Sequence, residues 1–417
     1  MLYLKKFVFF SLIIVVSISI YNLISYIHNM SVPVDVEFVG SDVCVSCHIP
    51  EHDGWASSLH SKMMRKVSKP GVVIADLHSD VITFDSHEAV WAIGSKWEQQ
   101  FMGESETGET LLPGAWLVNQ NKWQTTGWDG WQVPDPLKRC HGCHTVGLDV
   151  ETGHFVEPSI GCESCHGPGS WHTNTAGVGQ IVSGLDAQLC GQCHTRGRST
   201  DGEYFFPVGY KPGDTLTDFF KEEEPDYIQN SSKWWGNGHP RKRHQEYYSW
   251  NQGGHVNSLK SLTDNYDGKY GEVTGKCLSC HAAEAIADGQ SENYELSEVQ
   301  YGITCVTCHN SHADLEKPRL ECSNCHGESA SHHNPTINQQ HIPCPSEANV
   351  QCVQCHMPLT VMNGGDYTLH SHRAGIIPPS DTKKFGVPNS CANGGCHADK
   401  SIDWQIDSYK GFYKNNK

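Results

Sequence analysis

One five-residue pattern, C-x-x-C-H, recurs eight times along this chain of 417 residues. The copies begin at Cys44, Cys140, Cys162, Cys190, Cys277, Cys305, Cys322 and Cys352, and a ninth copy, stretched by two residues, runs from Cys391 to His397. The chain holds 19 Cys and 26 His, so chance would place only about 0.05 copies in it. The pattern therefore serves a chemical purpose that constrains the whole fold.

A C-x-x-C-H pentad attaches a c-type haem: both thiols become thioethers and the adjacent His binds the iron. We number the nine sites in chain order. The thioether cysteines are Cys44 and Cys47, Cys140 and Cys143, Cys162 and Cys165, Cys190 and Cys193, Cys277 and Cys280, Cys305 and Cys308, Cys322 and Cys325, Cys352 and Cys355, and Cys391 and Cys396. The proximal iron ligands are His48, His144, His166, His194, His281, His309, His326, His356 and His397.

Structural zinc and a disulfide framework are the competing interpretations of paired cysteines. Neither requires a His directly after the second Cys, yet a His stands there in all nine sites. The stretched spacing of site 9 also occurs in tetrahaem cytochromes of the c3 type. The sequence therefore predicts nine covalently bound haem c groups, which use 18 of the 19 Cys.

The composition fits a chain built around cofactors. Nine haems leave about 46 residues each, and the chain is 37% hydrophobic with 40 Gly. We expect a mainly α and irregular fold with low secondary-structure content, packed by haem. The formal charge of −17 excludes haem propionates, so the true surface is still more acidic. It disfavours nucleic acid as a partner and favours proteins with basic patches.

The N-terminus differs from the rest of the chain. After Lys5 and Lys6, an uncharged run covers residues 7–27, long enough to cross a bilayer as a helix. A cleaved secretory peptide is the alternative, but no small-residue cleavage motif follows. We expect an uncleaved, single-pass signal anchor in the cytoplasmic membrane. The positive-inside rule then puts the haem region in the periplasm or outside the cell.

The spacing of the sites divides the chain into six segments. These are the cytoplasmic tip and transmembrane anchor, 1–30; a tether with site 1, 31–61; a β-rich insertion, 62–139; a trihaem module, 140–200; a haem-free connection, 201–276; and a pentahaem module, 277–417. The insertion alternates apolar runs with Gly and Pro turns and is rich in Trp. Its Trp residues are expected in the core, with a ligand site as the alternative.

Seventeen histidines remain after the proximal ligands, against only seven Met. Low-spin electron-transfer haems need a second axial ligand, and imidazole supplies it at low potential. The candidates are His60, His172, His255, His312, His332 and His372, with His370 as the alternative to His372, followed by His87, His239, His244 and His341. Each could instead bond a propionate or orient another ligand. We expect all nine irons to be six-coordinate and low-spin.

Three sequence features together resemble a known family. They are C-x-x-C-H-G-P-G-S-x-H from Cys162 to His172, the two W-x4-H segments at Trp55 and Trp250, and the tail from Cys355 to Trp404. The sequence resembles the periplasmic multihaem cytochromes c related to cytochrome c-554, within the superfamily of nitrite reductase and hydroxylamine oxidoreductase. The resemblance implies closely packed haems and electron relay. Catalytic members can carry a proximal Lys, and this chain has no C-x-x-C-K.

Two functions follow from these features. The first is electron transfer between a membrane or periplasmic donor, such as a quinol dehydrogenase or a soluble cytochrome, and another redox protein. The second is an oxidoreductase that acts on a small nitrogen or sulfur compound at one haem with an open distal site. The cationic run from Arg241 to His244 is where such a substrate could bind, although it could equally neutralise propionates. Whether the chain forms an oligomer or a larger complex stays open.

Overall fold

The computed structural model describes residues 17, 35–105, 108–124, 135–225, 232–264, 268, 271–313, 319–327, 344 and 350–415. The α-helices among them are α2 Ser41–Cys44, α3 Ile49–Ser57, α4 Gly142–His144, α5 Glu163–His166, α6 Ser170–Asn174, α7 Gln188–His194, α8 Glu246–Asn251, α9 Lys260–Thr263, α10 Gly275–His281, α11 Ala283–Asp288, α12 Cys305–Cys308, α13 Cys322–His326, α14 Cys352–His356, α15 Pro379–Phe385 and α16 Ile402–Asn415. Only α3 and α16 of these described helices exceed seven residues. Such low regular structure fits the expected multihaem fold.

Most of the pentads lie on short helical turns. The helices α5, α7, α10, α12, α13 and α14 each carry the second Cys of a pentad. A helical turn brings residues three apart onto one face, so both thiols of C-x-x-C point the same way. The local conformation thus prepares each pair of thiols for one porphyrin edge.

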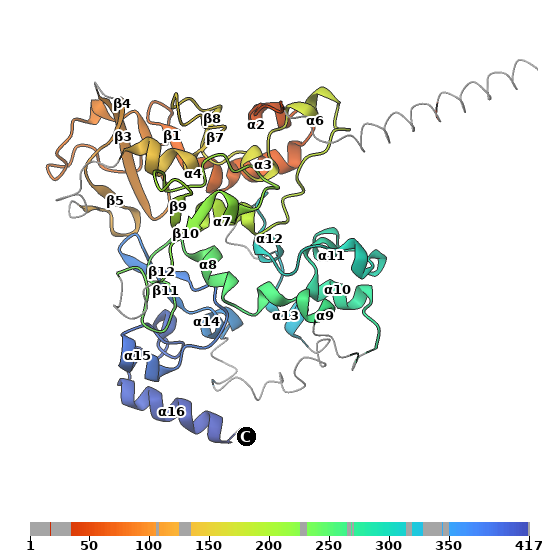
Figure 1. Ribbon diagram of the computed structural model, residues 1–417. Coiled ribbons are helices and arrows are strands. Elements are labelled where there is room, and N and C mark those ends of the chain that lie inside the picture. The colour runs from red at the N-terminus through yellow and green to blue at the C-terminus, as the bar shows by residue number, and fades with distance from the viewer. Residues whose placement is uncertain are drawn as a thin grey trace, which may run out of the picture.

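The largest sheet has six antiparallel strands at one end of the molecule (Figure 1). They are β1 Met64–Lys66, β2 Trp91–Ile93, β3 Glu98–Ser105, β4 Gly108–Leu111, β5 Ala115–Leu117 and β6 Lys122–Gln124, all within the segment for which the sequence predicts strands. Trp116 and Trp123 are buried, with ring centroids 5.7 Å apart. These two Trp residues therefore belong to the core of the sheet region.

A buried amide ties the sheet to its neighbouring loop. Oε1 of Gln99, a fully buried residue of β3, accepts hydrogen bonds from the backbone N–H groups of Ile74 and Ala75. Its Nε2 donates to the carbonyl of Val72 at 2.9 Å. All of these polar groups are satisfied, so the loop is fixed against the sheet without a desolvation penalty.

Three two-stranded sheets complete the regular structure: β7 Thr145–Val146 with β8 Glu157–Pro158, β9 Gly197–Ser199 with β10 Phe220–Glu222, and β11 Leu359–Asn363 with β12 Asp366–His370. In Figure 1, helices α9 to α13 gather on one side of the lower half, and α14 to α16 lie on the other side with β11 and β12. Helix α8 lies between these groups and the upper half.

Across the described part of the chain, no helix combines the length and the apolar character needed to cross a membrane. The expected anchor, residues 7–27, lies outside the described residues except for Ser17. It therefore stays a prediction.

Candidate functional site

Five of the proximal histidines each lie opposite another imidazole, with about 6 Å between the two ring centroids. Three pairs involve the first half of the chain: His48 with His172 at 6.2 Å between ring centroids, His194 with His60 at 6.4 Å, and His166 with His312 at 5.9 Å. Two pairs belong to the second half: His326 with His255 at 6.1 Å, and His309 with His372 at 6.0 Å. In every pair the second residue is one of the candidate distal ligands.

These intervals fit an iron between the rings. Two metal–nitrogen bonds of about 2 Å, and about 1 Å from each nitrogen to its ring centre, add to about 6 Å. A direct stacking contact between imidazoles would be much closer. The five intervals cluster between 5.9 and 6.4 Å, which is the separation that bis-histidine ligation needs.

The Nδ1 atoms of several of these rings are held by the protein. Nδ1 of His166 lies 2.7 Å from the carbonyl oxygen of Val182, and Nδ1 of His172 lies 2.8 Å from that of Gly179. A carbonyl acceptor keeps the proton on Nδ1 and leaves Nε2 as the metal ligand. The residues present therefore suit a haem. When bound, the haem would supply one-electron redox chemistry.

Site 4 differs in the partner of its proximal ligand. Nδ1 of His194 lies 3.3 Å from Oε2 of Glu246, a carboxylate rather than a carbonyl. Burial opposes a charge on this imidazole, but the bond with Glu246 raises the pKa of His194 to about 9. A carboxylate partner makes the imidazole a stronger electron donor. The haem of site 4 would therefore have a lowered reduction potential.

The two W-x4-H segments occupy matching positions. The indole Nε1 of Trp55 donates to the carbonyl of Ile160 at 2.7 Å, two residues before site 3. The indole Nε1 of Trp250 donates to the carbonyl of Ile303 at 3.1 Å, two residues before site 6. The His five residues after each Trp then faces the next proximal ligand, at site 4 and at site 7. These contacts relate sites 3 and 4 to sites 6 and 7.

The remaining candidates lie elsewhere. His87 is exposed beside the large sheet. His239 is buried, with Nδ1 2.8 Å from Oγ of Ser371, and His244 has Nδ1 3.1 Å from the carbonyl oxygen of Cys193. None of these three shares a ring pair with a proximal ligand among the described residues. His332 and His341 lie outside the described residues, so their role stays a prediction.

Site 2 is one of the four sites outside these five pairs. No described imidazole is paired with the ring of His144, which lies against the backbone carbonyl of Met63. Burial, together with the neighbouring charge of Arg243, lowers the pKa of His144 to about 4. Within the described residues, Nε of Arg65 is buried without a hydrogen-bond partner. Such an orphaned donor fits the propionate of a haem.

Contacts between thiols join the nine sites into one connected set. In five pairs, thiols of different sites lie within interaction range of each other: Cys44 with Cys162, Cys143 with Cys193, Cys190 with Cys305, Cys280 with Cys325, and Cys322 with Cys352. Three further pairs interact electrostatically at longer range: Cys165 with Cys190, Cys308 with Cys322, and Cys355 with Cys396. The sequence fixes which residues carry the thiols, but only the fold brings thiols of different sites together.

Sequence reasoning missed a buried carboxylate at site 3. Glu163, between the two Cys of the pentad, is 1% exposed and accepts hydrogen bonds from the backbone N–H groups of Val39, Gly40 and Gly169. It joins the segment before site 1 to site 3. Its acidic identity at a variable pentad position was the available signal, but its partners are distant in the sequence.

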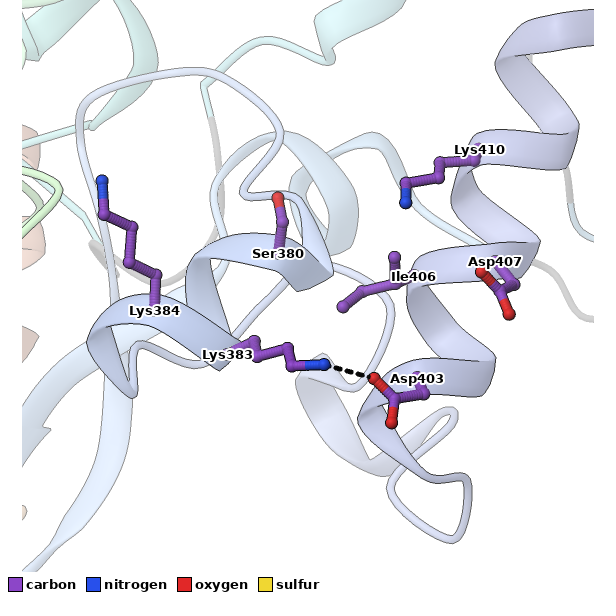
Figure 2. Close-up of a pocket in the computed structure, with 7 residues that line it drawn as sticks. All are labelled: Ser380, Lys383, Lys384, Asp403, Ile406, Asp407 and Lys410. Atoms are coloured by element: carbon purple, nitrogen blue, oxygen red, sulfur yellow. Dashed lines mark hydrogen bonds and ion pairs between the residues drawn. The ribbon is translucent and has the colours of Figure 1, made fainter.

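The described residues also form an open surface pocket of about 500 Å³ between α15 and α16 (Figure 2). Charged side chains line it, and Lys383 Nζ lies 2.7 Å from Asp403 Oδ1. The lining contains neither Cys nor His. It is therefore not a haem attachment site.

Two family patterns match parts of the chain. Cytochrome c7 and related cytochrome c matches residues 264–327, and cytochrome c554 and c-prime matches residues 118–167. A search of curated protein sequences gave no significant match.

Solved structures match over most of the chain. The outer cell wall cytochrome OcwA is 26% identical, with a TM-score of 0.76, and the match covers 89% of this chain and 86% of OcwA. An undecahaem cytochrome from the S-layer of Carboxydothermus ferrireducens is 19% identical, with a TM-score of 0.55, over 92% of this chain and 60% of its own length. The chain carries covalently bound haem c and is a multihaem cytochrome c that is similar in two segments to cytochrome c7 and cytochrome c554.

Proposed function

We propose that this protein relays electrons through nine haem c groups, most of them with two histidine ligands. The observation that carries this function is the set of five imidazole pairs at 5.9–6.4 Å. Imidazole on both faces keeps an iron low-spin and leaves no position for a substrate. Such haems exchange electrons with each other and do no chemistry on small molecules.

The contacts between thiols support a particular order of haems. A main line runs through sites 1, 3, 4, 6, 7, 8 and 9, with site 2 attached at site 4 and site 5 attached at site 7. Attachment sites whose thiols interact lie near each other, which brings their porphyrins close together. The protein supplies the spacing, the ligands and the electrostatics, and the haems carry the electrons.

Electrons enter from a quinol dehydrogenase or a soluble cytochrome and leave to another redox protein. The likeness to a cytochrome named for the outer cell wall supports a haem domain outside the cytoplasm. The apolar run of residues 7–27 supports a single-pass anchor in the cytoplasmic membrane. The net charge of −17 favours partners with basic surfaces.

Haem content and ligation test this function together. Pyridine haemochrome titration of the purified full-length protein is expected to give nine haems per chain, resistant to extraction with acidic acetone. Electron paramagnetic resonance of the oxidised protein is expected to be dominated by low-spin ferric signals. A majority of high-spin haems, or a content far below nine, would contradict the electron-relay function.

A second candidate function is an oxidoreductase that acts on a small nitrogen or sulfur compound. It is favoured by site 2, where no imidazole among the described residues faces His144. Turnover at that site would add to the relay and would draw electrons from it through site 4.

A further inference from the structure

The stretched pattern of site 9 closes with the same backbone bond as the regular pentads. In three regular pentads the N–H of the proximal His donates to the carbonyl of the first Cys. These bonds measure 2.9–3.0 Å and join His48 to Cys44, His166 to Cys162, and His309 to Cys305. In site 9 the N–H of His397 donates to the carbonyl of Cys391 at 3.2 Å, although two additional residues lie between them. The stretched pattern can therefore present a Cys and a His to one haem as a regular pentad does.

The additional length forms a bulge outside this bond. Gly394 and Gly395 have φ of 62° and 81°, in the left-handed region that glycine adopts without steric cost. Among the described residues, no atom lies within 4 Å of a Cβ built at either position. The backbone conformation, rather than a lack of space, therefore requires glycine here. Regular structure in the bulge is limited to one 3-10 turn, Asn393–Gly395, so its position depends on the side chains around it.

A buried amide caps the start of the stretched pattern. Asn389 is 2% exposed, and its Oδ1 accepts hydrogen bonds from the backbone N–H groups of Cys391 at 2.9 Å and Ala392 at 3.1 Å. A helix N-cap has the same arrangement, with a side-chain oxygen that satisfies N–H groups two or three residues later. Nδ2 of Asn389 donates to Oγ1 of Thr382 at 2.8 Å and to Oε1 of Gln405 at 2.9 Å. Asn389 thus ties the first Cys of site 9 to α15 and α16.

Two further buried amides hold the bulge and the end of the pattern. Asn393 pairs with the backbone of Leu359: its Oδ1 accepts from the N–H at 2.9 Å, and its Nδ2 donates to the carbonyl at 3.2 Å. Nε2 of Gln405 donates to the carbonyls of His397 at 3.0 Å and Lys400 at 3.1 Å. Removing one of these buried amides leaves its partners unsatisfied and frees that part of the pattern.

We propose that Asn389, Asn393 and Gln405 are positioning residues for the haem of site 9, and that they replace the helical turn that aligns the thiols of regular pentads. Attachment adds each thiol across a vinyl C=C of the porphyrin. A C–S bond forms, the proton goes to the terminal vinyl carbon, and no oxidant or reductant is consumed. Both thiols have to reach their vinyl groups, so their alignment controls the reaction. The inference rests on the proposed haem at site 9, at one end of the relay.

The haem content of single variants of the full-length protein tests these residues. In N389A and in Q405A, the intact chain is expected to have mostly the wild-type mass less one haem, because the thiols of site 9 are no longer aligned. Alkylation and proteolysis should find free thiols at Cys391 and Cys396 that the wild type lacks. The variant N389D should regain this haem, since its carboxylate accepts the same two N–H bonds. General destabilisation of the fold would not remove one particular haem.

A matched variant tests whether a regular pentad needs the same support. Gln351 directly precedes Cys352 of site 8, and its side chain accepts a hydrogen bond from the N–H of Gln354 in the capping box of α14. In Q351A the helical turn remains, so all nine haems are expected. Loss of the site 8 haem in Q351A would overturn the contrast between the stretched and the regular sites. A full set of haems in N389A and Q405A would overturn the positioning role, and so would an N389D variant that lacks the same haem as N389A.

The wild type, measured alongside, separates this inference from the electron-relay function. Nine haems in the wild type and in every variant would overturn the positioning role and leave the relay standing. Free thiols at Cys391 and Cys396 in the wild type would show that site 9 takes no haem, which would also overturn the inference. A haem content far below nine in the wild type would instead contradict the proposed function itself.

Discussion

Sites 3 and 2 carry the same pentad but sit in different surroundings. His166 of site 3 faces His312 at 5.9 Å, with the two rings inclined by only 15°. His144 of site 2 has no such partner in the described structure and lies under the influence of Arg243. The pentad thus determines where a haem is attached, whereas the tertiary fold determines what stands opposite the proximal ligand. One sequence motif can therefore stand in different surroundings at two positions of the same chain.

The largest effect is expected from making site 3 resemble site 2. In H312A the imidazole opposite His166 is lost, so one haem equivalent should change from low-spin to high-spin and acquire affinity for imidazole added to the buffer. Electron paramagnetic resonance and optical titration measure both changes. His154 is exposed, and H154A is the matched control, expected to match the wild type. An unchanged spectrum in H312A would show that His312 is no iron ligand.

A smaller effect is expected from site 4, whose proximal ligand differs from that of site 3 in its outer partner. In E246Q the carboxylate beside Nδ1 of His194 becomes neutral, so the reduction potential of one haem should rise by tens of millivolts. Spectroelectrochemical titration measures the shift. The spin state should stay low-spin, because His60 still faces His194. A titration identical to that of the wild type would show that Glu246 does not affect the reduction potential of the haem at site 4.

A carboxylate, Glu109, lies beside His141 in the pentad of site 2, and the stability of this region should depend on pH. Oε2 of Glu109 lies 2.6 Å from Nε2 of the buried His141, and this bond lowers the pKa of Glu109 below its usual 4.5. A carboxyl with a lowered folded-state pKa stabilises the fold above its unfolded pKa. That contribution is lost as the pH falls through the folded value. The free energy of unfolding of the wild type, measured with urea, should therefore fall below pH 4.5. The E109Q variant should lose part of this pH dependence. An equal acid dependence in E109Q would contradict the role of this pair.

The smallest effect is expected at the surface, far from both sites. Lys383 and Asp403 form an exposed ion pair at the pocket between α15 and α16, and exposed pairs contribute little to stability (Figure 2). K383Q should leave the melting temperature and all haem spectra as in the wild type. A lower melting temperature would show that this ion pair stabilises the fold, and changed haem spectra would show that the pocket acts on a haem.

The attachment cysteines and the proximal ligands could be proposed from the sequence because all of those residues lie within one pentad. The sequence also predicted His60 and His255 as second ligands, but not the sites they face. His60 follows site 1 yet faces His194 of site 4, since Trp55 anchors its segment before site 3. Glu163 could not be predicted, because its role depends on backbone groups of the tether that only the fold brings to it. Long-range contacts of this kind leave no local pattern.

An anomalous iron map from crystals of the full-length protein tests the central claim most directly. The predicted result is nine iron peaks, five of them midway between the paired imidazoles of His48 and His172, His60 and His194, His166 and His312, His255 and His326, and His309 and His372. Nine iron peaks together with an imidazole opposite His144 would contradict the contrast between sites 2 and 3. Iron absent from the midpoints of the five pairs would contradict the account as a whole.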